Sequence, residues 1–154
     1  MVTYYSKAWL EAGKEALNNS EKHLKQGKKL NGIFDFRILD GPDGKDRRGT
    51  WEFENGKCLN VSYECQPAPW TELREMPLDS GHVGRISCPF SLLAKLNKGE
   101  MSPMKAFTTP EYILEGQKMK FITMMTALNS WNEHVARIEC NYDFQATDNK
   151  GNEI

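Results

Sequence analysis

Apolar positions in the first part of the chain follow the period of a helix. Between residues 7 and 17 they recur at three- and four-residue intervals, and Ser6 precedes them as a helix cap. Ser20 is in position to cap a second, short helix, in which Leu24 is the apolar residue. We therefore expect two helices before the first strand.

From residue 33 the period changes to two. Apolar and polar residues alternate through the segments 33–38, 50–54 and 59–63, as they do in strands with one buried face. Gly-Pro-Asp-Gly separates the first two segments, and Asn-Gly, the preferred two-residue hairpin turn, separates the second pair. The three segments predict an antiparallel meander.

Residues 65–81 interrupt this alternation. Two prolines lie within 67–69, and a proline cannot donate a hydrogen bond to the ladder of a central strand. We expect a long loop here, with one helical turn after Trp70. A loop of this length and composition is a candidate lid over a binding site.

The second half predicts short strands and helices in alternation. We expect them at 83–87 (strand), 89–99 (helix, capped by Cys88), 102–107 (helix) and 111–115 (strand). The segment 117–131 predicts a helix that is apolar nearly all round and is therefore buried on more than one side. Residues 137–144 alternate again and predict a final strand, and the polar residues 146–154 predict a frayed tail.

Composition indicates one ordinary globular domain, which we assign to residues 1–145. The chain has 154 residues, of which 39% are hydrophobic and 27% charged. No apolar run approaches the roughly 20 residues that cross a bilayer, and the first residues lack the apolar core of a signal peptide. We therefore expect a cytoplasmic protein, whose four cysteines are free thiols.

The balance of positive and negative charge argues against some classes of binding partner. The formal net charge is -1, and nucleic-acid binding requires a basic footprint. The sequence thus argues against nucleic acid as a partner and against a polybasic membrane tether.

Motifs for catalysis and metal binding are absent from the sequence. It contains no Gly-x-Ser-x-Gly, no Cys-x-x-Cys and no His-x-x-x-His. Cys88 follows His82 by six residues, which allows a nucleophile and base, although a small buried thiol before a helix explains Cys88 better. We expect no metal and no cofactor.

Methionine and aromatic residues concentrate between positions 101 and 131. Methionine is flexible and fills irregular spaces, so the concentration fits a plain core. It also fits a deformable apolar cavity that holds a lipid. The residues alone leave both interpretations open.

Two blocks of the sequence, in this order, resemble the sterol carrier protein 2 family, also called the sterol-transfer domain. The block at 29–57 is similar to the family's first hairpin, with a glycine before the strand and the turns Asp-Gly-Pro-Asp-Gly-Lys and Asn-Gly-Lys. The block at 90–107 is similar to the family's helix, its glycine and its Met-x-Pro-x-x-Ala-Phe segment. The likeness extends from about residue 14 to residue 131.

The resemblance implies an α+β fold: a mostly antiparallel sheet of five to six strands, with helices covering one face and an apolar tunnel between them. It implies non-catalytic binding and transfer of a fatty acid, fatty acyl-CoA, phospholipid or sterol-like molecule. Carried over by position, the ligand-binding lining would be Phe34, Phe36, Trp51, Phe53, Phe90, Leu93, Met101, Met104, Phe107, Met124, Met125 and Leu128.

Contacts beyond the tunnel are also expected. Arg85, Lys118 and Arg137 are candidates for binding a ligand's polar headgroup at the tunnel mouth. The strand at 137–144 can add a sheet edge or pair with another subunit to form a homodimer. Transient contact with a membrane is compatible with lipid transfer.

Two alternative functions remain. The fold also occurs as an accessory interaction module, in which the protein's own side chains fill the cavity. An enzyme acting on acyl thioesters would require Cys88 and His82 within hydrogen-bond reach of each other.

Overall fold

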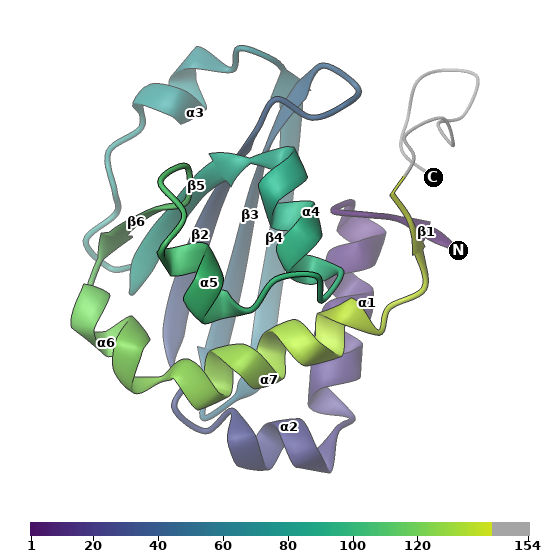
Figure 1. The fold of residues 1–154 in the computed structure, drawn as a ribbon, viewed down its shortest axis with the longest axis vertical. Coiled ribbons are helices and arrows are strands. Elements are labelled where there is room, and N and C mark those ends of the chain that lie inside the picture. Colours follow the sequence, from purple (N-terminus) through teal and green to yellow (C-terminus); the bar gives the residue numbers. More distant parts are fainter. Residues whose placement is uncertain (143–154) are drawn as a thin grey trace.

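A five-stranded sheet with most of the helices gathered on one face forms the body of the protein (Figure 1). The computed structural model describes residues 1–142. The strands of the sheet are β2 (Gly32–Leu39), β3 (Lys45–Glu54), β4 (Lys57–Pro67), β5 (Gly84–Pro89) and β6 (Ile113–Gly116), in the order β4-β3-β2-β5-β6. The helices are α1 (Lys7–Asn18), α2 (Glu21–Gln26), α3 (Thr71–Glu75), α4 (Phe90–Asn97), α5 (Pro103–Phe107), α6 (Lys118–Thr123) and α7 (Met125–Ala136).

The expected meander is confirmed. β2 pairs antiparallel with β3 and β3 with β4. The Asn-Gly turn joins β3 to β4, and Asn55 and Gly56 both have positive φ, as this hairpin turn requires. β5 then pairs parallel with β2 and antiparallel with β6, so the sheet is mixed. The α+β class is confirmed, with one parallel pair at the centre.

The two faces of the sheet differ in chemistry. Phe34, Phe36 and Ile38 point to the inner face, toward the helices, and are buried there. Asp35 and Arg37, which alternate with them, point to the outer face, since successive side chains of a strand alternate. The core is therefore one-sided, and the outer face carries charge.

Segment 65–81 is not a lid over the helix-covered face. Its first three residues belong to β4, where Pro67 is tolerated because β4 is an edge strand. The rest carries α3 across the outer face, where Arg37 Nη1 donates to the carbonyls of Leu73 (3.2 Å) and Arg74 (2.8 Å). The carbonyls of this segment thus serve as acceptors for a half-buried arginine on the charged face.

The Asp46 carboxylate fixes this segment further. It is fully buried and accepts from the Trp70 backbone N–H (2.9 Å) and from Arg74 Nε (2.8 Å). Burial alone would raise the pKa of Asp46, but the bonds from Arg74 and two backbone amides outweigh it and lower the pKa. Asp46 thus stays ionised and anchors the start of α3.

The helix expected over 117–131 is two helices. α6 ends at Thr123, the chain turns at Met124, and α7 continues to Ala136. Met119 is 72% and Ile122 53% exposed, so α6 is not buried all round as expected. Phe121 and Met124, three residues apart on one face, carry the burial instead.

Two further boundaries differ from expectation. Cys88 belongs to β5, and Pro89 caps α4 in its place. The final strand β7 has two residues, Cys140–Asn141, and pairs in parallel with β1 (Val2–Thr3), away from the main sheet. The turn that ends α7 accounts for the short strand, because its backbone N–H groups at 137 and 138 donate back to the helix. Residues 143–154, which include the expected tail, lie outside the described part.

A buried histidine joins the N-terminal helices to α7. In α2 the fully buried side chain is His23, and Leu24 is only half-buried. His23 Nε2 lies 2.9 Å from the Gly56 carbonyl, which can only accept, so Nε2 carries the proton and Nδ1 accepts from the Ser130 hydroxyl at 2.8 Å. Burial lowers the pKa of His23.

We predict that acid destabilises the protein through His23. The lowered pKa means that its contribution to stability is complete above the unfolded-state value of about 6.5 and is lost as the pH falls through the folded-state value. Urea unfolding of the wild type between pH 7.5 and 5 should show this fall in unfolding free energy. His23→Gln should be less stable by about 1–3 kcal/mol at pH 7.5, because buried partners are left unpaired, with a shallower fall toward pH 5. Equal slopes for the two proteins would contradict the prediction.

Candidate functional site

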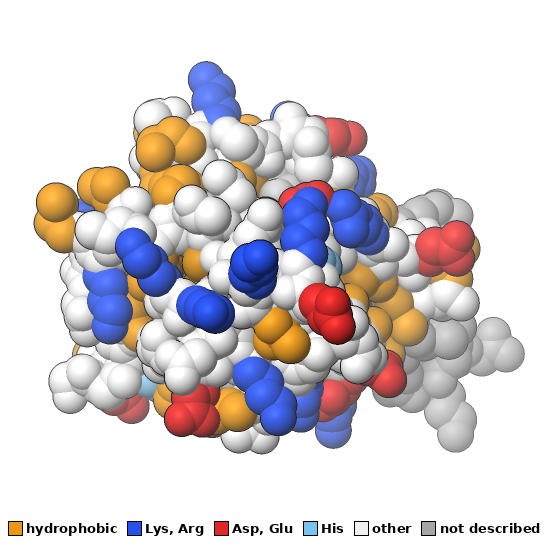
Figure 2. All heavy atoms as spheres, turned by 90° about the horizontal axis from the view of Figure 1, so that it is seen from below, with side chains coloured by type: hydrophobic (Ala, Val, Ile, Leu, Met, Phe, Trp, Pro, Cys, Tyr) orange, Lys and Arg blue, Asp and Glu red, His pale blue; other side chains and the backbone are white. Residues whose placement is uncertain are grey.

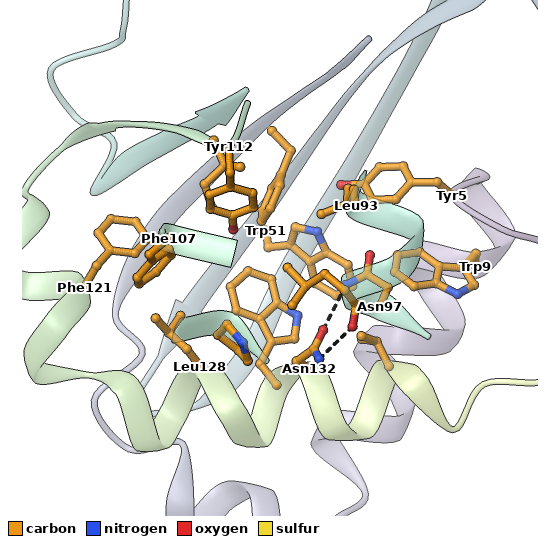
Figure 3. A pocket seen from close by; sticks show the side chains of 16 residues that line it. Tyr5, Trp9, Trp51, Leu93, Asn97, Phe107, Tyr112, Phe121, Leu128 and Asn132 are labelled. Atoms are coloured by element: carbon orange, nitrogen blue, oxygen red, sulfur yellow. Dashed lines mark hydrogen bonds between the residues drawn. The ribbon is translucent and has the colours of Figure 1, made fainter. Parts of the chain in front are cut away.

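A small cavity lies between the inner face of the sheet and the helices α4, α5 and α7 (Figure 3). Its volume is about 50 Å³. Side chains from distant parts of the chain converge on it: the turn before α1, α1, β2, β3, β5, the helices α4 to α7, and the loop before β6. Only the tertiary fold brings these segments together.

Some of the residues expected to line a tunnel border this cavity. They are Phe36, Trp51, Leu93, Phe107 and Leu128. Phe36 and Trp51 reach it because the inner face of the sheet points toward the helices, a choice that alternation alone left open. Their role as ligand contacts remains a prediction.

The other expected lining residues lie elsewhere. Phe34, Phe53, Phe90 and Met124 are buried in the core beside the cavity without bordering it. Met125 is half-buried against the core, Met104 is 49% exposed on α5, and Met101 borders a separate, open hollow on the surface. The methionines thus contribute little to the cavity wall, which is mainly aromatic.

Sequence reasoning missed a set of lining residues. They are Tyr5, Trp9, Ile86, Leu96, Asn97, Pro103, Tyr112, Phe121, Trp131, Asn132 and Val135. Trp9, Leu96, Phe121 and Trp131 carried a signal, since each lies on an apolar helix face. Tyr5 and the two asparagines carried none, because a residue outside a periodic pattern does not show where its side chain points.

Trp131 forms the roof of the cavity. Its ring centroid lies 5.3 Å from that of Trp51 and 5.8 Å from that of Phe36, both edge-to-face. Aromatic pairs at these distances add stabilisation to the burial of their surfaces. The roof is therefore held by specific ring contacts.

An amide pair forms part of the cavity wall. Asn97 Nδ2 donates to Asn132 Oδ1 (3.1 Å), and Asn132 Nδ2 donates to the Leu96 carbonyl (2.8 Å) (Figure 3). The Tyr4 hydroxyl donates to Asn97 Oδ1 at 2.6 Å. Asn132 also borders the open hollow on the surface. Asn132 thus lies between the cavity and the hollow, and Asn97 holds its side chain from the cavity side.

The cavity wall carries no charge. None of the described residues that line it is Asp, Glu, Lys, Arg or His. Burial raises the pKa of the Tyr5 and Tyr112 hydroxyls far above the ordinary value, so both stay neutral. The site can therefore offer apolar contact, hydroxyls and amides, and no counter-charge.

The expected headgroup residues do not border the cavity. Arg85 lies on the outer face, where its Nη1 donates to the Met76 carbonyl (2.7 Å) and its Nη2 to Glu115 Oε1 (3.0 Å). Arg137 borders the open hollow and pairs with Glu133 at 2.7 Å. Lys118 is the first residue of α6, outside the cavity wall.

Cys88 and His82 are not within hydrogen-bond reach of each other. Cys88 pairs with Ile38 in register and is buried on the inner side of the sheet. The His82 ring lies 3.9 Å from Asp35 Oδ2, on the outer side. The sheet separates the thiol from the imidazole, so the structure does not bring together the nucleophile and base that the alternative of an acyl-thioester enzyme requires.

We predict that Cys88 is unreactive in the folded protein. Burial raises its pKa to about 12, so almost no thiolate forms at pH 8. Brief iodoacetamide treatment at pH 8, followed by peptide mass mapping, should label the half-buried Cys65 and leave Cys88 unmodified. Labelling of all four cysteines in urea provides the control. Rapid modification of folded Cys88 would contradict the assignment.

Residues 1–142 contain neither a candidate metal site nor a candidate membrane-spanning helix. That part of the chain has no group of three or more His, Cys, Asp or Glu side chains able to hold a metal ion. It also has no helix that is both long enough and apolar enough to span a membrane.

Comparison with known proteins connects this arrangement to one fold. No family model and no curated protein matches the sequence. A crystal structure of sterol carrier protein 2 superimposes with a TM-score of 0.72 at 15% identity, over 88% of this chain and 99% of the other. A solution structure of a Thermus thermophilus protein, described as possibly a sterol carrier protein, gives 0.73 at 14% identity, over 93% and 94%.

A third similar structure is the apo form of sterol carrier protein 2 from Yarrowia lipolytica. Its TM-score is 0.51 at 14% identity, over 87% of this chain and 93% of the other. In each of the three cases the match spans nearly the whole of both chains. The cavity between sheet and helices therefore lies within a domain that has the sterol carrier protein 2 fold.

Proposed function

We propose that the protein binds a lipid in the cavity beneath Trp131 and carries it without chemical change. The observation that carries the proposal is the wall itself, which is apolar or neutral at every described position. Such a wall favours the aliphatic part of a ligand through burial of apolar surface. The fold shared with sterol carrier protein 2 structures supports the same function.

Binding requires the cavity to widen. Its volume of about 50 Å³ is far below the roughly 300–1,000 Å³ of typical ligand sites. Two short helices border the space: α5 contributes Phe107 and α6 contributes Phe121. No side-chain hydrogen bond caps α6. Outward displacement of these helices would move two aromatic rings out of the space and lengthen it.

The small volume also favours a second function, an interaction module with a filled cavity. Phe107 and Phe121 pack edge-to-face with centroids 6.2 Å apart, inside the space a ligand would take. In this case the protein would bind no lipid at all. The two functions make opposite predictions in one experiment.

We predict that the protein takes up one lipid molecule, and that filling the cavity prevents it. Native mass spectrometry of the delipidated protein with a fluorescent long-chain lipid should show a one-to-one complex. Leu128→Trp adds more bulk than about 50 Å³ can hold and should lower uptake at least tenfold. Leu78→Trp, on the segment that covers the outer face, is the matched control and should leave uptake unchanged. A wild type that takes up no lipid supports the interaction module.

The solvent-exposed side of α5 and α6 suits contact with a membrane. Most of the large hydrophobic side chains that the described chain exposes lie on or between α5 and α6: Met104, Ile113, Met119 and Ile122. Three lysines lie on these helices: Lys105, Lys118 and Lys120. Figure 2 shows hydrophobic side chains gathered near one edge of the molecule, with Lys and Arg side chains beside them. Apolar residues with basic neighbours bind anionic lipid surfaces.

We predict that the protein binds vesicles containing anionic phospholipid and that α6 inserts. Replacing Met119 and Ile122 together with serine should reduce flotation with such vesicles several-fold, because less apolar surface enters the bilayer. Leu78→Ser, on the opposite face of the sheet, should float like the wild type. Equal flotation of the α6 variant and the wild type would exclude α6 as the contact.

A further inference from the structure

We propose that the Tyr5 hydroxyl donates a hydrogen bond to an uncharged oxygen of the bound lipid, so that the site prefers a neutral lipid, such as a long-chain alcohol, over an ionised fatty acid. The proposal rests on the lipid binding proposed above and adds the class of ligand. It follows from an unpartnered buried hydroxyl, from the way the chain holds it, and from the absence of charge in the described wall around it.

The Tyr5 hydroxyl is buried and unpartnered. Tyr5 is 1% exposed, and its oxygen has no hydrogen-bond partner in the described structure. The side chain borders the cavity, and Figure 3 shows its hydroxyl directed inward, toward Leu93. Buried polar groups in native proteins are nearly always satisfied, so an exception at a cavity wall points to a missing partner.

The chain holds this side chain in place at a cost. Tyr5 has φ of 49°, in the left-handed region that side chains other than glycine rarely adopt. Ser6, which follows Tyr5, is itself held in place. Its Oγ donates to the Thr3 carbonyl (2.7 Å) and accepts from the Trp9 backbone N–H (3.2 Å). The conformation of Tyr5 is thus imposed by the start of α1.

The sheet leaves room for the hydroxyl at one position. Gly49 of β3 lies against the Tyr5 ring, and a Cβ at that position would collide with the hydroxyl oxygen. A glycine in the interior of a strand weakens the strand, and close approach of another group explains its presence. The hydroxyl therefore occupies a space that β3 leaves for it.

The hydroxyl keeps its proton and can donate it to a ligand's oxygen. Burial raises the pKa of Tyr5 far above its ordinary value, so the proton stays on the oxygen. The Trp51 indole N–H points its hydrogen toward the same oxygen and opposes this rise, but it makes no hydrogen bond of good geometry there and, as a donor, cannot accept the Tyr5 proton. The proton thus remains available for an alcohol, ketone or ester oxygen.

The surroundings disfavour an ionised headgroup. The described wall of the cavity carries no cationic side chain. Arg47, which also lies on the inner face, forms an ion pair with Asp43 at 2.6 Å and does not border the cavity. A carboxylate would therefore lose its hydration without gaining a counter-charge. A neutral oxygen needs only the hydrogen bond that Tyr5 supplies.

The test compares three ligands that share one chain length: hexadecan-1-ol, palmitate and hexadecane. Their affinities for the delipidated full-length protein are measured by quenching of tryptophan fluorescence at pH 7.5. We expect the wild type to bind the alcohol more tightly than palmitate and hexadecane. Tyr5→Phe should bind the alcohol about tenfold more weakly and hexadecane equally well. Its melting temperature without ligand should stay level or rise, because an unsatisfied polar group is removed.

Tyr4→Phe is the matched control. The Tyr4 hydroxyl already donates to Asn97 Oδ1, so this variant should melt at a lower temperature and keep the preference for the alcohol. Equal binding of the alcohol by wild type and Tyr5→Phe, or tighter binding of palmitate by the wild type, would overturn the proposal. A wild type that binds none of the three ligands, and no fluorescent lipid either, would overturn the proposed function and this inference with it.

Discussion

The packing of Trp131 against the inward side chains of β2 and β3 is the contact on which the rest of the molecule depends. Its ring lies between 4.8 and 5.8 Å, centroid to centroid, from those of Phe34, Phe36, Trp51 and Phe53. One side chain of α7 thus packs against both strands of the β2–β3 hairpin. It sets the height of the helix above the sheet, and three of these rings, Trp131, Phe36 and Trp51, border the cavity.

The inner face of the sheet is held by apolar packing, whereas the outer face requires its buried charges to be paired. Asp35 and Arg85 are almost fully buried there, and buried charges must be paired. Arg48 Nε lies 3.1 Å from Asp35 Oδ1, and Glu115 pairs with both Arg37 and Arg85. The segment that carries α3 completes this network by supplying backbone carbonyls. Segment 65–81, whose composition predicts a lid, is therefore held on the outer face of the sheet by hydrogen bonds.

Much of the fold follows from local patterns in the sequence. The period of two in β2 and β3, the Asn-Gly turn and the serine caps of α1, α2 and α5 act within a few residues, and each is present in the structure. The break at Met124 was missed because the apolar pattern continues through it. The role of His23 was missed because its partners, Gly56 and Ser130, lie far along the chain.

The site was harder to predict than the fold, because a cavity depends on how distant segments pack together, and local sequence patterns do not show this. The strand residues Phe36 and Trp51 were found through alternation, but Tyr5 lies in a turn without a pattern. Asn97 and Asn132 lie on different helices, and only the packing of α4 on α7 makes them a pair. The expected arginine Arg85 shows the reverse error, since strand alternation turns it away from the cavity.

The short pairing of β1 with β7 has a consequence for the order in which the protein is assembled. The Tyr4 backbone N–H donates to the Asn141 carbonyl (2.9 Å), so the segment that positions Tyr5 is fixed by residues about 140 positions further on. Contacts this distant in sequence form late, because the chain between them must first be closed. During synthesis on the ribosome, the wall of the cavity therefore stays incomplete until nearly all the described chain has emerged. Until β1 has paired with β7, Tyr5 is not held in place and the wall of the cavity is incomplete.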